Sequence, residues 1–198
     1  MSQPQLKVTY FEGIPGRAEL TRLALVYGGL KFENELLSFP EWAERKPSMP
    51  LGKLPACEVD GKLYIQSMAI ARYAGRLTGT YPAEPLEALK VDMILETLVE
   101  AMEKWIEVNF YTKDETLKAE KIKAAETEFF PKIFSFIEKS IEGKFLLGEQ
   151  VTLADLSMLD LYTNALPLFP GFLMSSYPKV AAILEALKAN PNIAAHLA

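Results

Sequence analysis

The spacing of apolar residues changes at about residue 80, and this change limits the folds that the chain can adopt. Before it, short segments with the alternation typical of strands are interleaved with segments at helical spacing. After it, apolar residues recur at helical spacing, with no convincing strand and no internal repeat. The pattern predicts an α/β domain over residues 1–77, a linker over 78–82 and an all-helical domain over 83–198.

The α/β domain is predicted to have the order β-α-β, a variable segment and then β-β-α. Its third strand segment consists of two short apolar runs joined at Asp60-Gly61, a favoured two-residue hairpin turn. Ser67 is the predicted N-cap of the last helix. The expected elements are strands over 6–11, 32–36 and 55–65 and helices over 17–27 and from Ser67 onward.

The second half contains several stripes of apolar residues at helical spacing. One stripe lies over 86–105 and another over 122–141, where we expect a bend at Pro131 because proline cannot donate its backbone hydrogen bond. Residues 154–166 are apolar nearly all round, which is typical of a buried central helix. The motif Thr152-x-x-Asp155 at its start is typical of a capping box, so Asp155 is assigned to folding and not to catalysis.

The use of individual residue types argues against several functions. Cys57 is the only cysteine, which excludes an intrachain disulfide and a cysteine-rich zinc site. His196 is the only histidine, so neither a hydrolase with an internal histidine base nor a His-rich metal site is favoured. The net charge of −5 argues against general nucleic-acid binding. We expect a cytoplasmic protein without membrane contact, because no secretory signal and no apolar run of roughly 18 residues is visible.

Four motifs, in order and at compatible spacing, resemble those of the cytosolic glutathione transferases. The resemblance covers essentially the whole chain and is strongest to the sigma class, which includes the haematopoietic prostaglandin D synthases. It implies a thioredoxin-like domain followed by a helical domain, glutathione as co-substrate and a homodimer. The motifs are Tyr10-Phe11-x5-Arg17-Ala18-Glu19, Gly52-Lys53-Leu54-Pro55, Gln66-Ser67-x-Ala69-Ile70-Ala71-Arg72-Tyr73 and Val151-Thr152-Leu153-Ala154-Asp155.

The resemblance implies that Tyr10 and Arg17 are the catalytic residues. A thiol with a pKa of about 8.5 is mostly protonated at neutral pH, and a hydroxyl that donates a hydrogen bond to the sulfur favours the reactive thiolate. Tyr10 would supply this hydroxyl, and Arg17 would support the thiolate electrostatically. Without the resemblance, Tyr10 could equally be a half-buried strand tyrosine and Arg17 a surface residue in a first helical turn.

The resemblance also predicts which residues bind glutathione. Leu54-Pro55 matches the place of a cis-proline whose preceding backbone pairs with a peptide ligand, although an ordinary trans bond is the alternative. Gln66 and Ser67, at a helix N-terminus, suit the γ-glutamyl carboxylate. Glu100 would reach glutathione bound by the other subunit, or would be a solvated helix carboxylate. The remaining predicted contacts to glutathione are Trp42, Lys46 and Lys53.

The pattern departs from that of the prostaglandin D synthases in two respects. One carboxylate of their divalent-metal site is replaced by Val99, so we predict no metal. Those enzymes place aromatic residues over the second substrate. Here one such position is Glu107, or Trp105 if the register slips, and another is Ser157, so no specific prostaglandin isomerase activity is predicted. The predicted partners are small hydrophobic electrophiles, in a subsite formed by Phe11, Gly16, Met102, Met158 and Tyr162.

The leading hypothesis is therefore conjugation of glutathione to hydrophobic electrophiles. The alternatives are a glutathione-dependent peroxidase or isomerase that uses the same thiolate, and a non-enzymatic glutathione- or ligand-binding protein of the same fold. A glutaredoxin-type reductase is disfavoured, because the only cysteine, Cys57, lies in a predicted strand and not at the start of the first helix.

Overall fold

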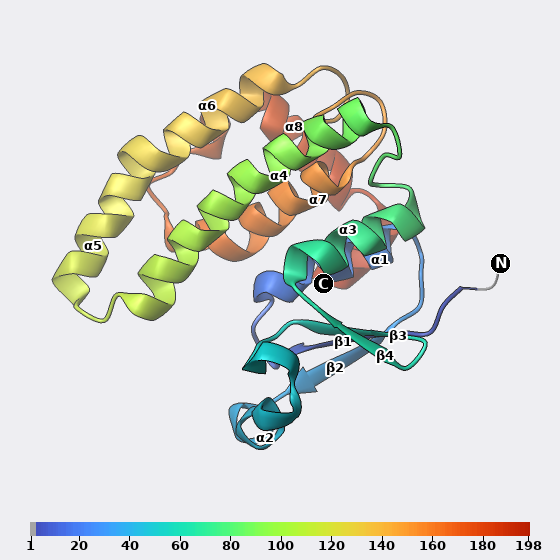
Figure 1. Cartoon of the computed structure of the whole chain (residues 1–198). Coiled ribbons are helices and arrows are strands. Elements are labelled where there is room, and N and C mark those ends of the chain that lie inside the picture. Colours follow the sequence, from blue (N-terminus) through green and yellow to red (C-terminus); the bar gives the residue numbers. More distant parts are fainter. Residues whose placement is uncertain (1–2) are drawn as a thin grey trace. The chain divides into compact units, whose positions relative to one another are not determined.

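A computed structural model describes residues 3–198, and residues 1 and 2 of the expected first domain lie outside this range. The chain divides into two compact units (Figure 1). The first extends through Tyr81 and includes Asn192–Ala198, and the second is Pro82–Pro191. The division falls within the segment predicted as a linker, and the last seven residues belong to the first unit.

The first unit is built on a four-stranded mixed sheet with the strand order β2-β1-β3-β4. Strand β1 is central: it pairs in parallel with β2 and antiparallel with β3. The predicted hairpin is confirmed, because Asp60 and Gly61 have φ of 50° and 78° and join the antiparallel strands β3 and β4. The strands are β1 Leu6–Phe11, β2 Glu33–Leu37, β3 Ala56–Val59 and β4 Lys62–Ile65.

The first unit has the helices α1, α2, α3 and α9. Helix α1 connects the two parallel strands, β1 and β2. A 3₁₀ turn over Gly16–Ala18 precedes α1, so the α-helix begins later than predicted. The prediction of Ser67 as an N-cap is wrong: α3 begins at Ser67, and Gln66, with a non-helical φ of 79°, holds the N-cap position. Helices α1 and α3 pack against each other. The bounds are α1 Glu19–Tyr27, α2 Phe39–Arg45, α3 Ser67–Thr78 and α9 Pro191–Leu197.

The second unit consists of helices, as predicted. Pro131 lies in the first turn of α6, where a missing N–H is tolerated, and a π-helical segment over Ala125–Phe129 separates α5 from α6. Two other π-helical segments, Glu107–Tyr111 and Leu161–Ala165, follow α4 and α7. The helices are α4 Pro85–Ile106, α5 Glu115–Ala124, α6 Phe130–Ser140, α7 Leu153–Asp160 and α8 Pro178–Lys188.

Helix α7 is the buried central helix that the sequence predicts, since every one of its residues is buried. Its predicted capping box is also present: the Asp155 carboxylate accepts hydrogen bonds from the backbone N–H and the hydroxyl of Thr152, both at 2.7 Å. The other carboxylate oxygen accepts the Leu146 N–H at 2.8 Å. Asp155 therefore joins the start of α7 to the preceding loop. No helix within residues 3–198 is long and apolar enough to cross a membrane.

Candidate active site

Tyr10 lies near the end of the central strand β1, and its hydroxyl is held by the turn that follows the strand. The Arg17 backbone N–H donates a hydrogen bond to the Tyr10 hydroxyl oxygen at 3.2 Å. Gly16 makes this approach possible: it has a φ of +45°, and a Cβ at this position would lie 2.6 Å from the same oxygen. Any other L-residue would meet both backbone strain and a steric clash. The turn therefore fixes the hydroxyl by local geometry.

Arg17 contributes its backbone amide to this arrangement, a role that the sequence did not indicate. Its side chain is exposed, in the 3₁₀ turn that precedes α1. A phenolic oxygen that accepts one hydrogen bond still carries a proton that it can donate, and the accepted bond polarises that O–H. The amide of Arg17 thus fixes the position of the Tyr10 hydroxyl oxygen.

Arg22 is a residue near Tyr10 that the sequence reasoning missed. It lies on α1 with only 4% of its surface exposed, and its guanidinium carbon is 5.9 Å from the centre of the Tyr10 ring. Its Nη1 donates to the Pro15 carbonyl at 3.4 Å, and its Nε donates to Asn34 Oδ1 at 2.9 Å. A buried charge requires such partners. The signal available in the sequence was an arginine within the otherwise largely apolar segment of α1.

The Leu54-Pro55 peptide bond is cis, as predicted. It precedes β3, whose first residue, Ala56, is paired with Thr9 of β1. The cis dipeptide therefore enters the sheet beside the end of β1 that carries Tyr10.

Gln66 and Ser67 lie at the N-terminus of α3, immediately after β4. Gln66 is one of three non-glycine residues with positive φ among residues 3–198, at 79°. Such conformations concentrate at ligand-binding positions, where the surrounding structure holds them. The first N–H groups of a helix have no acceptor within it, and the helix dipole favours an anion at this end. The start of α3 has the chemistry of a carboxylate-binding site.

Phe11 joins Tyr10 to the predicted glutathione-binding residue Trp42. Its ring centre lies 5.3 Å from that of Tyr10 and 5.7 Å from that of Trp42, both in edge-on geometry. Phe39 of α2 completes this aromatic cluster, with its ring centre 5.3 Å from that of Phe11. Three residues predicted from the sequence are thus in one contiguous group.

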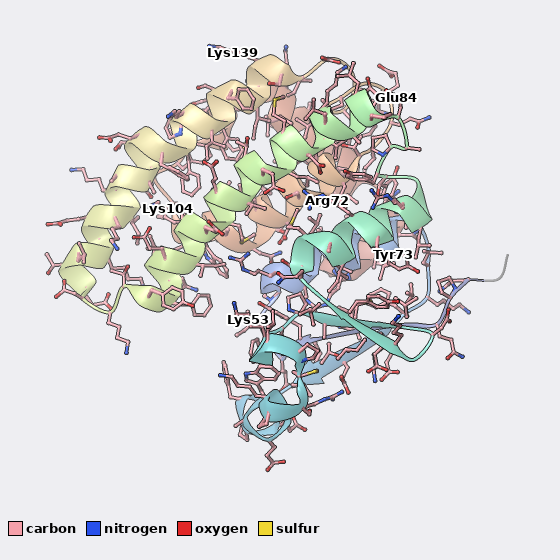
Figure 2. The ribbon with its side chains drawn as sticks, viewed as in Figure 1. Lys53, Arg72, Tyr73, Glu84, Lys104 and Lys139 are labelled. Carbon is pink, nitrogen blue, oxygen red and sulfur yellow. The ribbon has the colours of Figure 1, made fainter. Side chains whose placement is uncertain are left out.

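Lys46 and Lys53 lie on the exposed segment between α2 and β3, where Figure 2 labels Lys53. The Lys46 side chain lies over Gly52, where a Cβ would be 3.4 Å from Lys46 Cε. Both side chains are exposed to solvent. They give this segment positive charge next to the cis-proline.

The remaining predicted site residues lie in the second unit. Glu100 is exposed on α4 and Met102 is half-buried on the same helix. Met158 is 0% exposed within α7, so its side chain offers no surface to a ligand in this structure. Tyr162 is half-buried, with the Lys188 ammonium 5.3 Å from its ring centre.

Two of the three positions that correspond to the second-substrate aromatic residues, Glu107 and Trp105, have other partners. Glu107 forms ion pairs with Lys104 at 2.6 Å and Lys121 at 2.7 Å, and these hydrogen bonds lower the pKa of its carboxyl. Trp105 is buried and contacts Phe110 edge-on at 5.4 Å. Within residues 3–198, no group of three or more His, Cys, Asp or Glu side chains is arranged to hold a metal ion.

Comparison with known proteins places these features in one family. Residues 6–76 match the glutathione S-transferase N-terminal domain, and residues 100–198 match the glutathione S-transferase C-terminal domain. The chain belongs to the glutathione S-transferase family. Glutathione is the substrate that this family shares, and the chain is accordingly a glutathione transferase.

Relatives of this glutathione transferase include enzymes from a bird and a nematode. It is 33% identical to hematopoietic prostaglandin D synthase of Gallus gallus, over 97% of this chain and 94% of the relative. It is 34% identical to glutathione S-transferase 1 of Ascaris suum, over 96% of this chain and 94% of the relative. The solved sigma-class transferase of Fasciola hepatica superposes with a TM-score of 0.86 at 28% identity, covering 99% and 96% of the two chains. The predicted resemblance to the sigma class is confirmed.

Proposed function

We propose that this transferase conjugates glutathione to small hydrophobic electrophiles and that the Tyr10 hydroxyl activates the thiol. The observation that carries the proposal is the contact between Tyr10 and the turn after β1. The Arg17 amide is 3.2 Å from the hydroxyl oxygen, and Gly16 leaves room for it. This geometry presents an oriented hydroxyl donor at the end of a strand, next to an aromatic cluster.

The size of the required effect is within reach of one such donor. A thiol pKa of about 8.5 must fall by roughly 1.5 units for half of the bound thiol to be ionised at pH 7. One pKa unit corresponds to about 1.4 kcal/mol, and a hydrogen bond to a charged group contributes about 1.5–3 kcal/mol. A hydrogen bond from Tyr10 to the thiolate therefore suffices in order of magnitude. Arg17 would add a smaller electrostatic contribution from its exposed side chain.

Glutathione binding is proposed for the residues around the end of β1. The backbone of Leu54, before the cis bond to Pro55, would pair with the cysteinyl residue of glutathione. Gln66 and Ser67 would receive the γ-glutamyl carboxylate at the start of α3. The glycyl carboxylate would be bound by the remaining residues of this group, Trp42, Lys46 and Lys53.

Phe11 would provide the apolar surface next to the sulfur. It lies beside Tyr10, and its ring is part of a cluster with two other aromatic side chains. An apolar electrophile would gain about 25 cal/mol for each Å² of its surface that is removed from water. The position of Phe11 therefore favours hydrophobic over charged second substrates.

A homodimer is proposed as the working form of the enzyme. Three large apolar side chains, Leu86, Leu89 and Met93, are 58%, 63% and 46% exposed along one face of α4. Such a stripe is unfavourable in contact with water and suits an interface. Glu100 is exposed on the same helix, from which it would reach the glutathione of the second copy. A light-scattering mass of a monomer would contradict this proposal.

The test of the catalytic proposal is a glutathione titration with ultraviolet detection of the bound thiolate. We expect thiolate at neutral pH in the native protein and a loss of about tenfold or more in Tyr10→Phe. The matched control is Tyr64→Phe, which removes a hydroxyl from a half-exposed tyrosine on β4 and should leave the signal unchanged. Tight glutathione binding without thiolate in the native protein would sink the proposal and favour a binding protein.

An isomerase activity that uses the same thiolate is the second candidate. It is favoured by the likeness to the Gallus gallus prostaglandin D synthase. It is disfavoured at the two positions considered for an aromatic contact to such a substrate: Glu107 is a carboxylate held in ion pairs, and Trp105 is buried. Turnover of an isomerisable endoperoxide, compared with that of aryl halides and hydroperoxides, would separate the two candidates.

A further inference from the structure

The only histidine of the chain is bound to the helix that supports Tyr10. His196 lies on α9, and its Nε2 is 2.6 Å from Oε1 of Glu19, the first residue of α1. The two residues are 177 positions apart in the sequence. Glu19 is only 6% exposed, so the contact covers a buried carboxylate. The contact between His196 and Glu19 joins the C-terminal helix to the start of α1.

A chain of polar contacts runs from this histidine to the turn beside Tyr10. The second carboxylate oxygen of Glu19 accepts from Arg22 Nη1 at 3.1 Å. The same Nη1 donates to the carbonyl of Pro15 at 3.4 Å. Pro15 is followed by Gly16 and by Arg17, whose N–H binds the Tyr10 hydroxyl. His196 is therefore connected to the candidate catalytic hydroxyl through Glu19, Arg22 and one turn of backbone.

Because Arg22 donates to both Glu19 and Pro15, a change at the His196 end of this series of contacts affects the turn beside Tyr10. Arg22 Nη1 divides its hydrogen bonding between Glu19 and Pro15, and its Nη2 is buried with no hydrogen-bond partner among residues 3–198. If His196 is removed, the buried Glu19 carboxylate keeps its ion pair with Arg22, and a buried charge that loses one of its partners is destabilised. The guanidinium would then shift toward Glu19 and away from Pro15.

We propose that His196 is a positioning residue that holds the Pro15–Arg17 turn, and with it the Tyr10 hydroxyl, through Glu19 and Arg22. The transferase proposed above supplies the reaction on which this role would act. The inference extends the candidate site to a C-terminal helix that carries none of the predicted substrate contacts.

The charges around this contact define when it is strongest. Burial raises the pKa of the Glu19 carboxyl, but the hydrogen bond and charge of His196 and the charge of Arg22 outweigh burial, and the net pKa is lowered. Helix α3, packed against α1, carries Arg72, Tyr73 and Arg76, and none of these side-chain types changes charge between pH 5 and 8.

The contact is therefore expected to be pH-dependent in a defined direction. A hydrogen bond between two charged groups is roughly twice as strong as one between neutral groups. The contact is lost in acid, as pH falls through the lowered pKa of the Glu19 carboxyl and Glu19 becomes protonated. We expect the turn to be held more firmly above that pKa than below it.

The experiment compares His196→Ala, His196→Gln and the native protein by two measurements. The first is hydrogen exchange of the Arg17 amide without glutathione, at pH 5.5 to 8. The second is the pH titration of the thiolate of bound glutathione. Lys7→Gln is the control. Lys7 lies on β1, three residues before Tyr10 and on the other face of the strand, and its Nζ is 2.7 Å from Glu58 Oε1, so the variant breaks an ion pair away from the turn.

We expect His196→Ala to increase exchange of the Arg17 amide about tenfold and to reduce the thiolate fraction at neutral pH about threefold, while Lys7→Gln changes neither. His196→Gln keeps a side-chain donor to Glu19, so it should restore much of the protection. This variant also distinguishes positioning from a simple loss of stability.

Two results would overturn the inference. One is an Arg17 amide that exchanges equally in His196→Ala and in the native protein. The other is faster exchange with an unchanged thiolate titration. If the native protein forms no thiolate at all, the proposed function fails, and the exchange measurement still decides whether His196 holds the turn.

Discussion

Two buried carboxylates, Asp155 in the second unit and Glu19 in the first, occupy the first turns of their helices in different surroundings. Asp155 accepts hydrogen bonds from neutral groups, the Leu146 amide and the amide and hydroxyl of Thr152. Glu19 is bound to Arg22 and to His196. Burial raises the pKa of Asp155 in spite of its hydrogen bonds, whereas the charged partners of Glu19 outweigh burial and lower its pKa. Asp155 caps the start of its helix, and Glu19 connects segments that are distant in the sequence.

The largest effect is expected from Asp155→Ala. The change removes a capping box and leaves the buried Leu146 amide without an acceptor. Losing the cap contributes about 1 kcal/mol and the unpaired amide about 2 kcal/mol. We expect the free energy of unfolding, measured with urea, to fall by about 3 kcal/mol. Glu149→Ala, in the exposed loop just before α7, is the control and should stay within about 0.5 kcal/mol.

Glu19→Gln should be the next largest and would show whether the charged partners matter. The amide keeps the shape but replaces the charged contacts of Glu19 with Arg22 and His196 by neutral ones, which destabilises by about 2 kcal/mol in urea unfolding. Unlike Asp155→Ala, it should also reduce the bound thiolate. The exposed Glu12→Gln is its control. An unchanged thiolate signal in Glu19→Gln would remove the functional difference between the two carboxylates.

Gly16→Ala should act on the turn between Glu19 and Tyr10. The added Cβ would lie 2.6 Å from the Tyr10 hydroxyl oxygen at a φ of +45°. We expect kcat/KM with a standard aryl halide to fall by at least about tenfold, roughly 1.4 kcal/mol. Gly13→Ala has similar backbone strain, with φ of +68°, but nothing within 4 Å of its Cβ. Equal losses in the two variants would show that strain alone is responsible.

The two carboxylates should also respond oppositely to acid. The lowered pKa of Glu19 means that its contribution to stability is present above pH 4.5 and is lost as pH falls through the folded-state value. The raised pKa of Asp155 means that its proton-linked contribution is greatest below pH 3.8 and is lost as pH rises. Urea unfolding from pH 7 to 3.5 should therefore show a shrinking gap between the native protein and Glu19→Gln. The gap to Asp155→Ala should grow instead.

Cys57 should give the smallest effect. Like Asp155, it is buried, and burial together with the nearby charge of Glu58 raises the pKa of its thiol to about 11. The native thiol should resist alkylation at pH 8 and react only in denaturant. Cys57→Ala should leave turnover within about twofold. Rapid labelling of the folded protein would show that this part of β3 opens to solvent.

Much of the fold follows from interactions between residues close together in the sequence. The strand Leu6–Phe11, the hairpin at Asp60-Gly61 and the capping box of Asp155 were predicted because each depends on a few adjacent residues. The cis bond of Leu54-Pro55 was predicted from a family resemblance, since an isolated Leu-Pro pair favours trans.

The sequence left the packing of one helix undecided and misplaced the start of another. The stripe over 86–105 includes Leu86, Leu89 and Met93, which are exposed, while a neighbouring stripe of α4 that includes Val91 and Ile94 is buried. Apolar spacing identifies a helix and its faces, but it does not decide which face packs inside when two faces are apolar. Ser67 was displaced from the N-cap by the positive φ of Gln66, which is unusual for a glutamine.

The sequence by itself determined that the strand carrying Tyr10 is followed by a glycine-containing turn and a helix, because these are local preferences of the backbone. Only the tertiary structure decided what surrounds that hydroxyl. It placed the Arg17 amide on the oxygen, buried Arg22 beside the ring and brought His196 to Glu19. Contacts between residues 177 positions apart depend on how helices pack, and packing is set by the whole core and not by any one segment.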